Sequence, residues 1–200
     1  MRTAYCFDLD GTLTRQELLP LIASSVGLGD EIEVLTQATI DGFLPFDKSF
    51  KLRVRLLRDA NLEWIHSALR QQVELDPHIQ AFISARPRQC FVVTGNLDLW
   101  VEPVLERLGV RSFTSRARMR DGCLEGVEEI LHKGDAVTSL RGEFERIVAV
   151  GEGMNDVPMF EAADLRVAYG GVHVPNRVLT GLSDFVVHEG EALCRLLNML

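Results

Sequence analysis

Two acidic clusters from opposite ends of the chain set the strongest limit on its fold. A short apolar run, residues 4–7, is followed at once by residues 8–12 (DLDGT). Far downstream, a second apolar run leads into residues 152–156 (EGMND). An apolar run that ends in acids and glycine is typical of a buried strand and the turn after it. A fold that brings both clusters to one edge of a sheet would create a site for a divalent metal and a phosphate.

The first cluster indicates a nucleophile beside a proton carrier. Residues two apart in a strand point to the same face, so Asp8 and Asp10 converge. Their repulsion raises one pKa and leaves the other group ionised. An ionised Asp8 can attack phosphorus without a partner base, and water can hydrolyse the resulting acyl phosphate. Asp10 would then carry the proton, while Gly11 lets the backbone turn close to a phosphate and Thr12 offers a hydroxyl.

A cation is required before a phosphate can approach these acids. At about 4 Å and an effective dielectric near 20, each pair of like charges repels by roughly 4 kcal/mol. Mg²⁺ prefers oxygen ligands and commonly takes one or two carboxylates together with substrate phosphate oxygens. We expect Asp8, Asp10 and Glu152 to bind it, with Asn155 and Asp156 orienting Glu152 from behind.

Two further elements suit phosphate binding. Residues 90–96 (CFVVTGN) form an apolar run that ends at Thr94, whose hydroxyl and a nearby backbone amide could bind a phosphate oxygen. Lys133 could hold the nucleophile and the phosphoryl group together. Each element is weak alone, because a single lysine is most often a solvated surface charge and DLDGT also fits a strand followed by a polar turn.

In order and spacing, these four elements resemble the haloacid dehalogenase superfamily of aspartate-nucleophile phosphatases. Members carry an acidic pair, a Ser or Thr, a Lys and a final acidic loop. Within the superfamily, the chain resembles the phosphoserine phosphatases over almost its whole length. The resemblance implies a magnesium-dependent phosphomonoesterase that forms a phospho-Asp8 intermediate and hydrolyses O-phosphoserine. It also implies that Asp10 reaches the metal through its backbone carbonyl, while Thr94 and Lys133 hold the phosphoryl oxygens.

The same resemblance implies a pocket for an amino-acid head. Phosphoserine phosphatases carry a Glu nine residues beyond the nucleophile, where Glu17 stands, and a Gly-x-Leu-x-Phe stretch followed by an Arg, matched by Phe46 and Arg53. Glu17 would receive the substrate amine and Arg53 its carboxylate, with Phe46 closing over both. One anion and one bidentate cation are suited to a zwitterion. Gly95 and Asn96 would line the substrate path.

Three positions depart from that family's pattern. Glu152 stands where an Asp is usual, Asn96 where a second Gly is common, and Gly11 where a Ser is common. The extra methylene of Glu152 moves its carboxylate by about 1.5 Å, and a shift of about 1 Å can cost roughly a hundredfold in rate. We therefore expect weaker activity or a metal preference extended to Mn²⁺. The alternatives are a phosphatase or phosphotransferase for another small metabolite, or a weakly active protein that binds an amino acid or phosphate.

The spacing of apolar runs predicts an α/β fold, a Rossmann-like, doubly wound parallel sheet with helices on both faces. Residues 15–75 show helical spacing and no strand, and the resemblance makes them a small helical cap over a core of residues 1–14 and 76–200. The Asp-Gly pair at 121–122 predicts a hairpin turn. The expected strands cover residues 3–8, 90–94 and 147–151, with weaker ones at 111–114, 165–168 and 184–187.

Composition limits the partners. The formal net charge of −8 argues against nucleic acid or an anionic membrane, so the expected partner is a small phosphomonoester, with the chain a monomer or homodimer. The four cysteines are far apart and predict neither a disulfide framework nor a zinc site. None of the five histidines, His173 included, has a spacing that suggests a metal ligand. No run of about 20 apolar residues appears, and we expect a cytoplasmic protein.

Overall fold

A computed structural model describes residues 2–200 of the chain. Met1, the first residue of the predicted core, lies outside the described residues. Within this range all of the predicted strands are present, and β2 and β3 run further than expected. The strands are β1 (Thr3–Phe7), β2 (Cys90–Leu97), β3 (Arg111–Arg120), β4 (Cys123–Glu129), β5 (Arg146–Gly151), β6 (Leu165–Tyr169) and β7 (Phe185–Val187).

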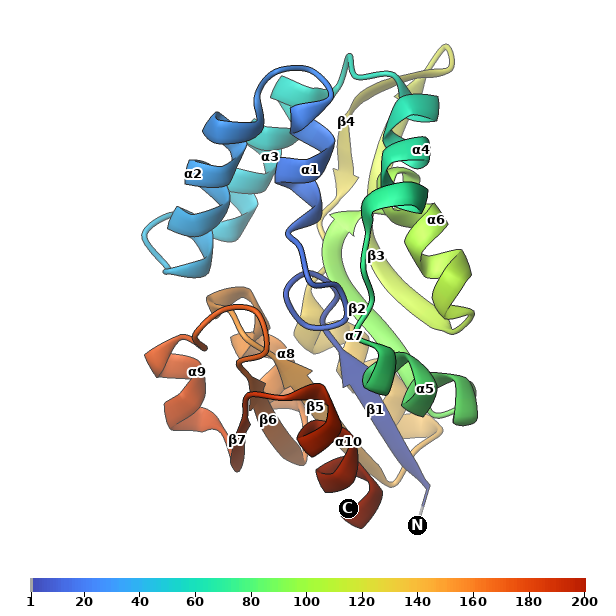
Figure 1. Cartoon of the computed structure of the whole chain (residues 1–200), viewed down its shortest axis with the longest axis vertical. Helices are drawn as coiled ribbons and strands as arrows, with labels where there is room; N and C mark the ends of the chain where they lie inside the picture. The colour runs from blue at the N-terminus through green and yellow to red at the C-terminus, as the bar shows by residue number, and fades with distance from the viewer. Residues whose placement is uncertain (1) are drawn as a thin grey trace.

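Helices occupy most of the chain between these strands (Figure 1). The α-helices are α1 (Leu18–Ser24), α2 (Gly29–Ile40), α3 (Phe46–Leu57), α4 (Leu62–Gln72), α5 (Pro77–Ala85), α6 (Asp98–Leu108), α7 (Lys133–Ser139), α8 (Val157–Ala162), α9 (Arg177–Leu182) and α10 (Gly190–Met199), and η1 (Leu140–Gly142) and η2 (Met154–Asp156) are short 3₁₀ turns.

The strands form one sheet in the order β4-β3-β2-β1-β5-β6-β7. All neighbours pair in parallel except β3 and β4, which are antiparallel, so the prediction of a parallel sheet is confirmed apart from one edge. The chain moves outward from β1 through β2 and β3 and then returns to β5 on the other side of β1. In open sheets of this kind, ligands bind where the strand order reverses, beyond the carboxyl ends of the strands. Here that place lies between β1 and β5.

Both faces of the sheet are covered, as alternation along the central strand requires. Tyr5 and Phe7 belong to one apolar cluster, which includes Phe82 of α5 at 5.1 Å from the Tyr5 ring. Ala4 and Cys6 belong to a second cluster with side chains of α7 and α8. Since all five residues of β1 are buried, its pattern is that of a strand buried on both sides. The doubly wound prediction is confirmed.

Strand β4 was not predicted, although its turn was. Asp121 and Gly122 have φ values of 50° and 80°, the left-handed pair that a tight hairpin needs. Each side chain of β4 is exposed or only partly buried, so the strand lacks the apolar alternation that marks a half-buried strand in a sequence.

Residues 15–75 form a helical insert after β1. Thr14 and Leu75 make an isolated antiparallel bridge, and the chain between them contains α1–α4 and no strand. Figure 1 shows α1, α2 and α3 standing beyond the carboxyl end of β1. The helical content matches the sequence prediction, while the division into a cap domain and a core domain stays a prediction. Across residues 2–200, no helix combines the length and hydropathy that a membrane span requires.

The return from the insert into the sheet depends on Asp76, and we predict a measurable loss when it is replaced. Asp76 is buried and its Oδ1 accepts the amides of His78 and Ile79, which caps α5. Asp76→Ala should lower the free energy of unfolding by about 1–2 kcal/mol in chemical denaturation. Asn61→Ala removes the exposed cap of α4, which accepts one amide, and serves as the control. An equal or larger loss for Asn61→Ala would contradict this account of α5.

Candidate active site

The two acidic clusters meet at the carboxyl ends of β1 and β5. The amide of Asp8 donates to the Val150 carbonyl at 3.0 Å, which continues the pairing of the two strands by one residue. Glu152 follows directly after β5 and is 3% exposed. The parallel register therefore brings residues 144 positions apart in sequence to one edge of the sheet, as predicted.

Lys133 links the two acidic clusters through ion pairs with Asp8 and Asp156. It begins α7, is 3% exposed, and its Nζ lies 2.6 Å from both Asp8 Oδ1 and Asp156 Oδ1. Burial alone would lower the pKa of Lys133, but Asp156 and then Asp8 outweigh it and raise the pKa. The lysine is thus a buried cation beside the predicted nucleophile, and it binds one of the two oxygens of Asp8.

Asp156 supports the loop that carries Glu152. Its Oδ1 binds Lys133, and its Oδ2 accepts the amides of Glu152 at 2.9 Å and Gly153 at 3.0 Å. This geometry fits the predicted orienting role of Asp156, which stays a prediction. Asn155 lies at the edge of the cavity above.

Asp10 is held as a proton carrier would be. Its Oδ1 accepts the Leu18 amide at 2.8 Å, and its Oδ2 accepts Asn96 Nδ2 at 2.5 Å. Burial, then the charges of Glu17 and Asp8, raise the pKa of Asp10 well above its ordinary value. This shift favours the protonated form of the Asp10 carboxyl group. Asn96, which the sequence placed on the substrate path, also fixes Asp10.

The loop at the end of β2 is fastened by a serine that the sequence analysis missed. Thr94 is 1% exposed, and its Oγ1 accepts the Asn96 amide at 3.2 Å. Ser115 is fully buried; its Oγ donates to the Gly95 carbonyl at 2.7 Å and accepts the Leu131 amide at 3.0 Å. Ser115 therefore ties the Thr94 loop to the segment that leads into Lys133. Nothing in the sequence marks it, because its partners are backbone atoms distant along the chain.

A small cavity of about 50 Å³ lies between the helical insert and the sheet edge. Of the predicted site residues, Lys133 and Asp156 do not line it, although Lys133 binds Asp8, which does. The others line it: Asp8, Asp10, Glu17, Phe46, Arg53, Thr94, Gly95, Asn96, Glu152 and Asn155.

Arg53 supplies a buried cation with unused hydrogen-bonding capacity. It is 3% exposed, its Nη1 donates to Thr36 Oγ1 at 3.0 Å, and its Nε has no partner. Burial lowers the pKa of Arg53 to about 10, against the opposing charges of Glu17 and Asp10, so it stays charged at neutral pH. A buried donor without an acceptor is costly, so this site is suited to an anionic ligand group.

Phe46 closes the cavity across to the sheet. Its ring stacks on Phe50 with centroids 5.3 Å apart, and a Cβ placed on Gly95 would lie 2.3 Å from Phe46 Cζ. Any side chain at position 95 would therefore push the ring out. The pair predicted to flank the substrate, Phe46 and Gly95, is in direct contact in this structure.

The buried carboxyl groups of the site outnumber the cations beside them, and the pKa values of Asp8 and Glu152 are raised. Burial and the charge of Asp156 raise the pKa of Asp8 to about 7, although Lys133 opposes this. Burial, then Glu17 and Asp8, raise the pKa of Glu152 to about 10. A divalent cation would favour the ionised forms of both carboxyl groups, as bound metals do. Glu152 Oε2 is buried without a hydrogen-bond partner, which fits a metal ligand.

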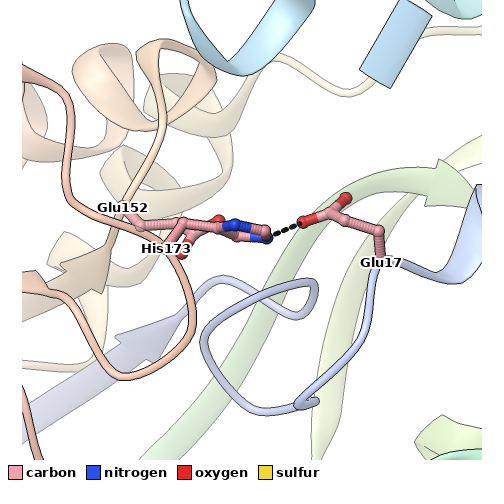
Figure 2. Close-up of side chains that lie close together, drawn as sticks. All are labelled: Glu17, Glu152 and His173. Carbon is pink, nitrogen blue, oxygen red and sulfur yellow. Dashed lines mark ion pairs between the residues drawn. The ribbon is translucent and has the colours of Figure 1, made fainter. Parts of the chain in front are cut away.

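The structure nevertheless groups Glu152 with different partners from those expected. Glu17, Glu152 and His173 each offer a ligand atom, and these atoms lie within 4.8 Å of one another (Figure 2). His173 Nε2 lies 3.3 Å from Glu17 Oε1, and this contact raises the pKa of His173. Sequence spacing gave no sign of this group, because the loop after β6 brings His173 close to Glu17 and Glu152, which lie far from it in the sequence.

Gly11 and Glu152 fit each other. Gly11 has a φ of 65°, and a Cβ there would lie 2.2 Å from Glu152 Oε1. The space that a side chain at position 11 would fill is thus occupied by the longer carboxylate. The two departures from the family pattern compensate for each other sterically.

Comparison with known proteins gives consistent matches. The family model described as haloacid dehalogenase-like hydrolase matches residues 6–161. A phosphoserine phosphatase of Methanocaldococcus jannaschii is 31% identical over 175 residues, which cover 82% of this chain and 83% of that protein. A solved phosphoserine phosphatase with a phospho-aspartyl intermediate analogue superposes with a TM-score of 0.85 at 27% identity, covering 100% of this chain and 98% of that one. A substrate-bound phosphoserine phosphatase gives 0.85 at 26% identity, with coverage of 100% and 99%.

The contact between Gly11 and Glu152 predicts a loss of metal affinity on enlarging Gly11. Gly11→Ala should displace the Glu152 carboxylate and weaken Mg²⁺ binding, measured by calorimetry, by about 10–100-fold. Gly27→Ala is the matched control, because Gly27 has a similar φ of 73° but nothing within 4 Å of its Cβ position. Glu152→Asp in the Gly11→Ala background should recover part of the affinity. Equal losses in the Gly11 and Gly27 variants would show that backbone strain, not the contact, is responsible.

The raised carboxyl pKa values predict how stability depends on pH. Near neutral pH the folded chain binds more protons than the unfolded chain, so without metal its free energy of unfolding falls as pH rises from about 5 to about 9. A bound divalent cation favours the ionised groups and should flatten this decline. Thermal melts across this range, with a chelator and with Mg²⁺, measure both slopes. Without metal, Glu152→Gln should make the free energy of unfolding fall less steeply with pH. Identical slopes with and without Mg²⁺ would contradict the assignment of these carboxyl groups to a metal site.

Proposed function

The chain belongs to the family of haloacid dehalogenase-like hydrolases, and from that premise we propose that it hydrolyses O-phosphoserine to serine and phosphate through a phospho-Asp8 intermediate. The observation that carries this proposal is the contrast between two neighbouring carboxyl groups. Asp8 is bonded to the buried Lys133 ammonium, while Asp10 is bonded to an amide and a carboxamide and has a strongly raised pKa. One is suited to attack and the other to donate a proton.

In the first step, a carboxylate oxygen of Asp8 forms a bond to phosphorus as the bond from phosphorus to the serine oxygen breaks. Asp10 gives its proton to that oxygen, so serine leaves as a neutral alcohol. Lys133 stabilises the charge shared by Asp8 and the phosphoryl group. Thr94 and the adjacent backbone offer hydrogen bonds to phosphoryl oxygens.

In the second step, Asp10 is ionised and takes a proton from water. The water oxygen bonds to phosphorus, and the bond from phosphorus to Asp8 breaks, which restores both aspartates. The hydrogen bonds from Leu18 and Asn96 hold Asp10 in the same place for both proton transfers. Burial of the cavity limits access of other nucleophiles.

We propose Mg²⁺ as the cofactor, held by Asp8, the Asp10 carbonyl and Glu152, with Mn²⁺ also accepted. The unpartnered Glu152 Oε2 and the raised carboxyl pKa values support this donor set. Such a cation offsets the charge of the carboxylates and the phosphate. We retain the cytoplasmic location and the monomer or homodimer as predictions from the sequence.

The amino-acid head would lie between Glu17 and Arg53. Arg53 Nε is buried and unpartnered, as a site for the substrate carboxylate requires. Glu17 reaches the same cavity from the start of the insert. Phe46 would cover the bound head, and its contact with Gly95 would have to open for entry.

One observation favours a second candidate substrate class. His173 lies 3.3 Å from Glu17, so the carboxylate assigned to the substrate amine already has a cationic partner when His173 is protonated. A small phosphomonoester that lacks an amine would leave that pair intact. The same catalytic groups would hydrolyse it.

Phosphate release from O-phosphoserine and from glycerol phosphate, both with Mg²⁺, distinguishes the two candidates. We expect faster turnover of O-phosphoserine and none in Asp8→Asn, which keeps the shape but removes the nucleophile. Glu17→Gln should raise KM for O-phosphoserine by about 10–100-fold, because it removes a hydrogen bond between charged groups, and such bonds typically contribute about 1.5–3 kcal/mol. It should leave KM for glycerol phosphate nearly unchanged.

Three results would contradict these assignments. Release by Asp8→Asn would exclude Asp8 as the nucleophile. A preference for glycerol phosphate, with Glu17→Gln affecting both esters alike, would replace O-phosphoserine with the second class. No release from either ester would favour a binding protein.

A further inference from the structure

We propose that Glu17, Glu152 and His173 form a second cation site, suited to zinc or a similar transition metal, whose occupancy blocks the amine side of the pocket. The three side chains come from three separate segments: the start of the helical insert, the loop after β5 and the loop after β6. Figure 2 shows Glu17 pointing toward His173, with Glu152 beside the imidazole.

A backbone hydrogen bond joins the two core loops that carry Glu152 and His173, so these two side chains are held near each other by the main chain. The Asn176 amide donates to the Glu152 carbonyl at 3.0 Å, which fastens the loop after β6 against the loop after β5. The Gly170 amide donates to the Val187 carbonyl at 2.8 Å at the start of the same loop. His173 lies between these two anchors.

Two of the three ligand groups have a buried atom that makes no hydrogen bond, and a cation could bind both atoms. Glu152 is 3% exposed, and its Oε2 is buried with no hydrogen bond. His173 Nε2 is also buried without a hydrogen bond, and its contact with Glu17 Oε1 spans 3.3 Å. Unsatisfied buried oxygen and nitrogen atoms that face one another are costly unless a ligand binds both.

The spacing suits a tetrahedral ion. Zinc binds nitrogen and oxygen at about 2.0–2.1 Å, so two of its ligand atoms in a tetrahedron lie about 3.3–3.4 Å apart. The measured 3.3 Å between His173 and Glu17 has this length. The remaining ligand atom, from Glu152, lies within 4.8 Å of both.

The two proposed sites share Glu152, and this one differs from the proposed magnesium site by its other two ligands, Glu17 and the imidazole of His173. Imidazole suits zinc and other transition metals, whereas magnesium prefers oxygen ligands and water. Because His173 is 27% exposed at its side chain, the group is open to ions from solvent. Metal there would occupy Glu17 and bind Glu152, and so would oppose binding of a substrate amine; this consequence rests on the proposed function, whereas binding itself does not.

Zinc binding measured by calorimetry in the presence of saturating Mg²⁺ tests the site without any turnover. We expect one zinc ion per chain. His173→Gln should weaken zinc binding by about tenfold or more. Loss of a residue that only orients a metal ligand already costs about that much, and His173 is proposed as a ligand itself. His78→Gln, an exposed histidine on α5, is the matched control and should bind zinc like the native chain. His173→Cys supplies a thiolate and should restore binding.

Turnover gives the second readout. Zinc should raise KM for O-phosphoserine in the native chain, and His173→Gln should be resistant to this rise. Thermal melts of each variant establish that it folds. Zinc binding that survives His173→Gln but is lost in Asp8→Asn would place the ion at the catalytic aspartates and overturn the proposal. Absence of zinc binding to the native chain would also overturn it.

Discussion

The buried ion pairs of Lys133 with Asp8 and Asp156 are the constraint on which the rest of the site depends. One ammonium group at 2.6 Å from two carboxylates joins the end of β1, the start of α7 and the loop after β5. Removing a partner from such a network leaves an uncompensated buried charge, which typically costs about 3–5 kcal/mol. The same lysine therefore holds three segments in place and opposes the rise in the pKa of Asp8, the proposed nucleophile.

The sequence could predict those parts of the fold and site that short-range patterns encode. Strands β1, β2 and β5 were expected because each is a short apolar run, and the structure buries almost all of their residues. The two acidic clusters were expected at the carboxyl ends of β1 and β5 because they follow those runs in the sequence. Strand β4 was missed because its side chains are largely exposed and show no apolar alternation. Ser115 and His173 were missed for another reason: their partners lie far along the chain, and only the folded loops bring them together.

The effect of the longer Glu152 side chain depends on which residue occupies position 11. Considered alone, its extra methylene predicts a misplaced ligand. Gly11 removes the side chain that would collide with it, so the longer carboxylate reaches its place through space left at a different strand end. The roles assigned to individual site residues stay predictions, but this steric complementarity explains how a longer acid is accommodated.

The contact between Phe46 and Gly95 bears on the choice between water and an alcohol as phosphoryl acceptor. The closed cavity, about 50 Å³, has room for only a few water molecules. In the proposed reaction, serine formed in the first step would have to pass the Phe46 ring to leave. Until it leaves, this serine could take the phosphoryl group back from Asp8, so a longer-lived closed state would favour reversal over hydrolysis. Opening of the helical insert, which carries Phe46, would thereby set how long the first product stays beside the phosphorylated aspartate.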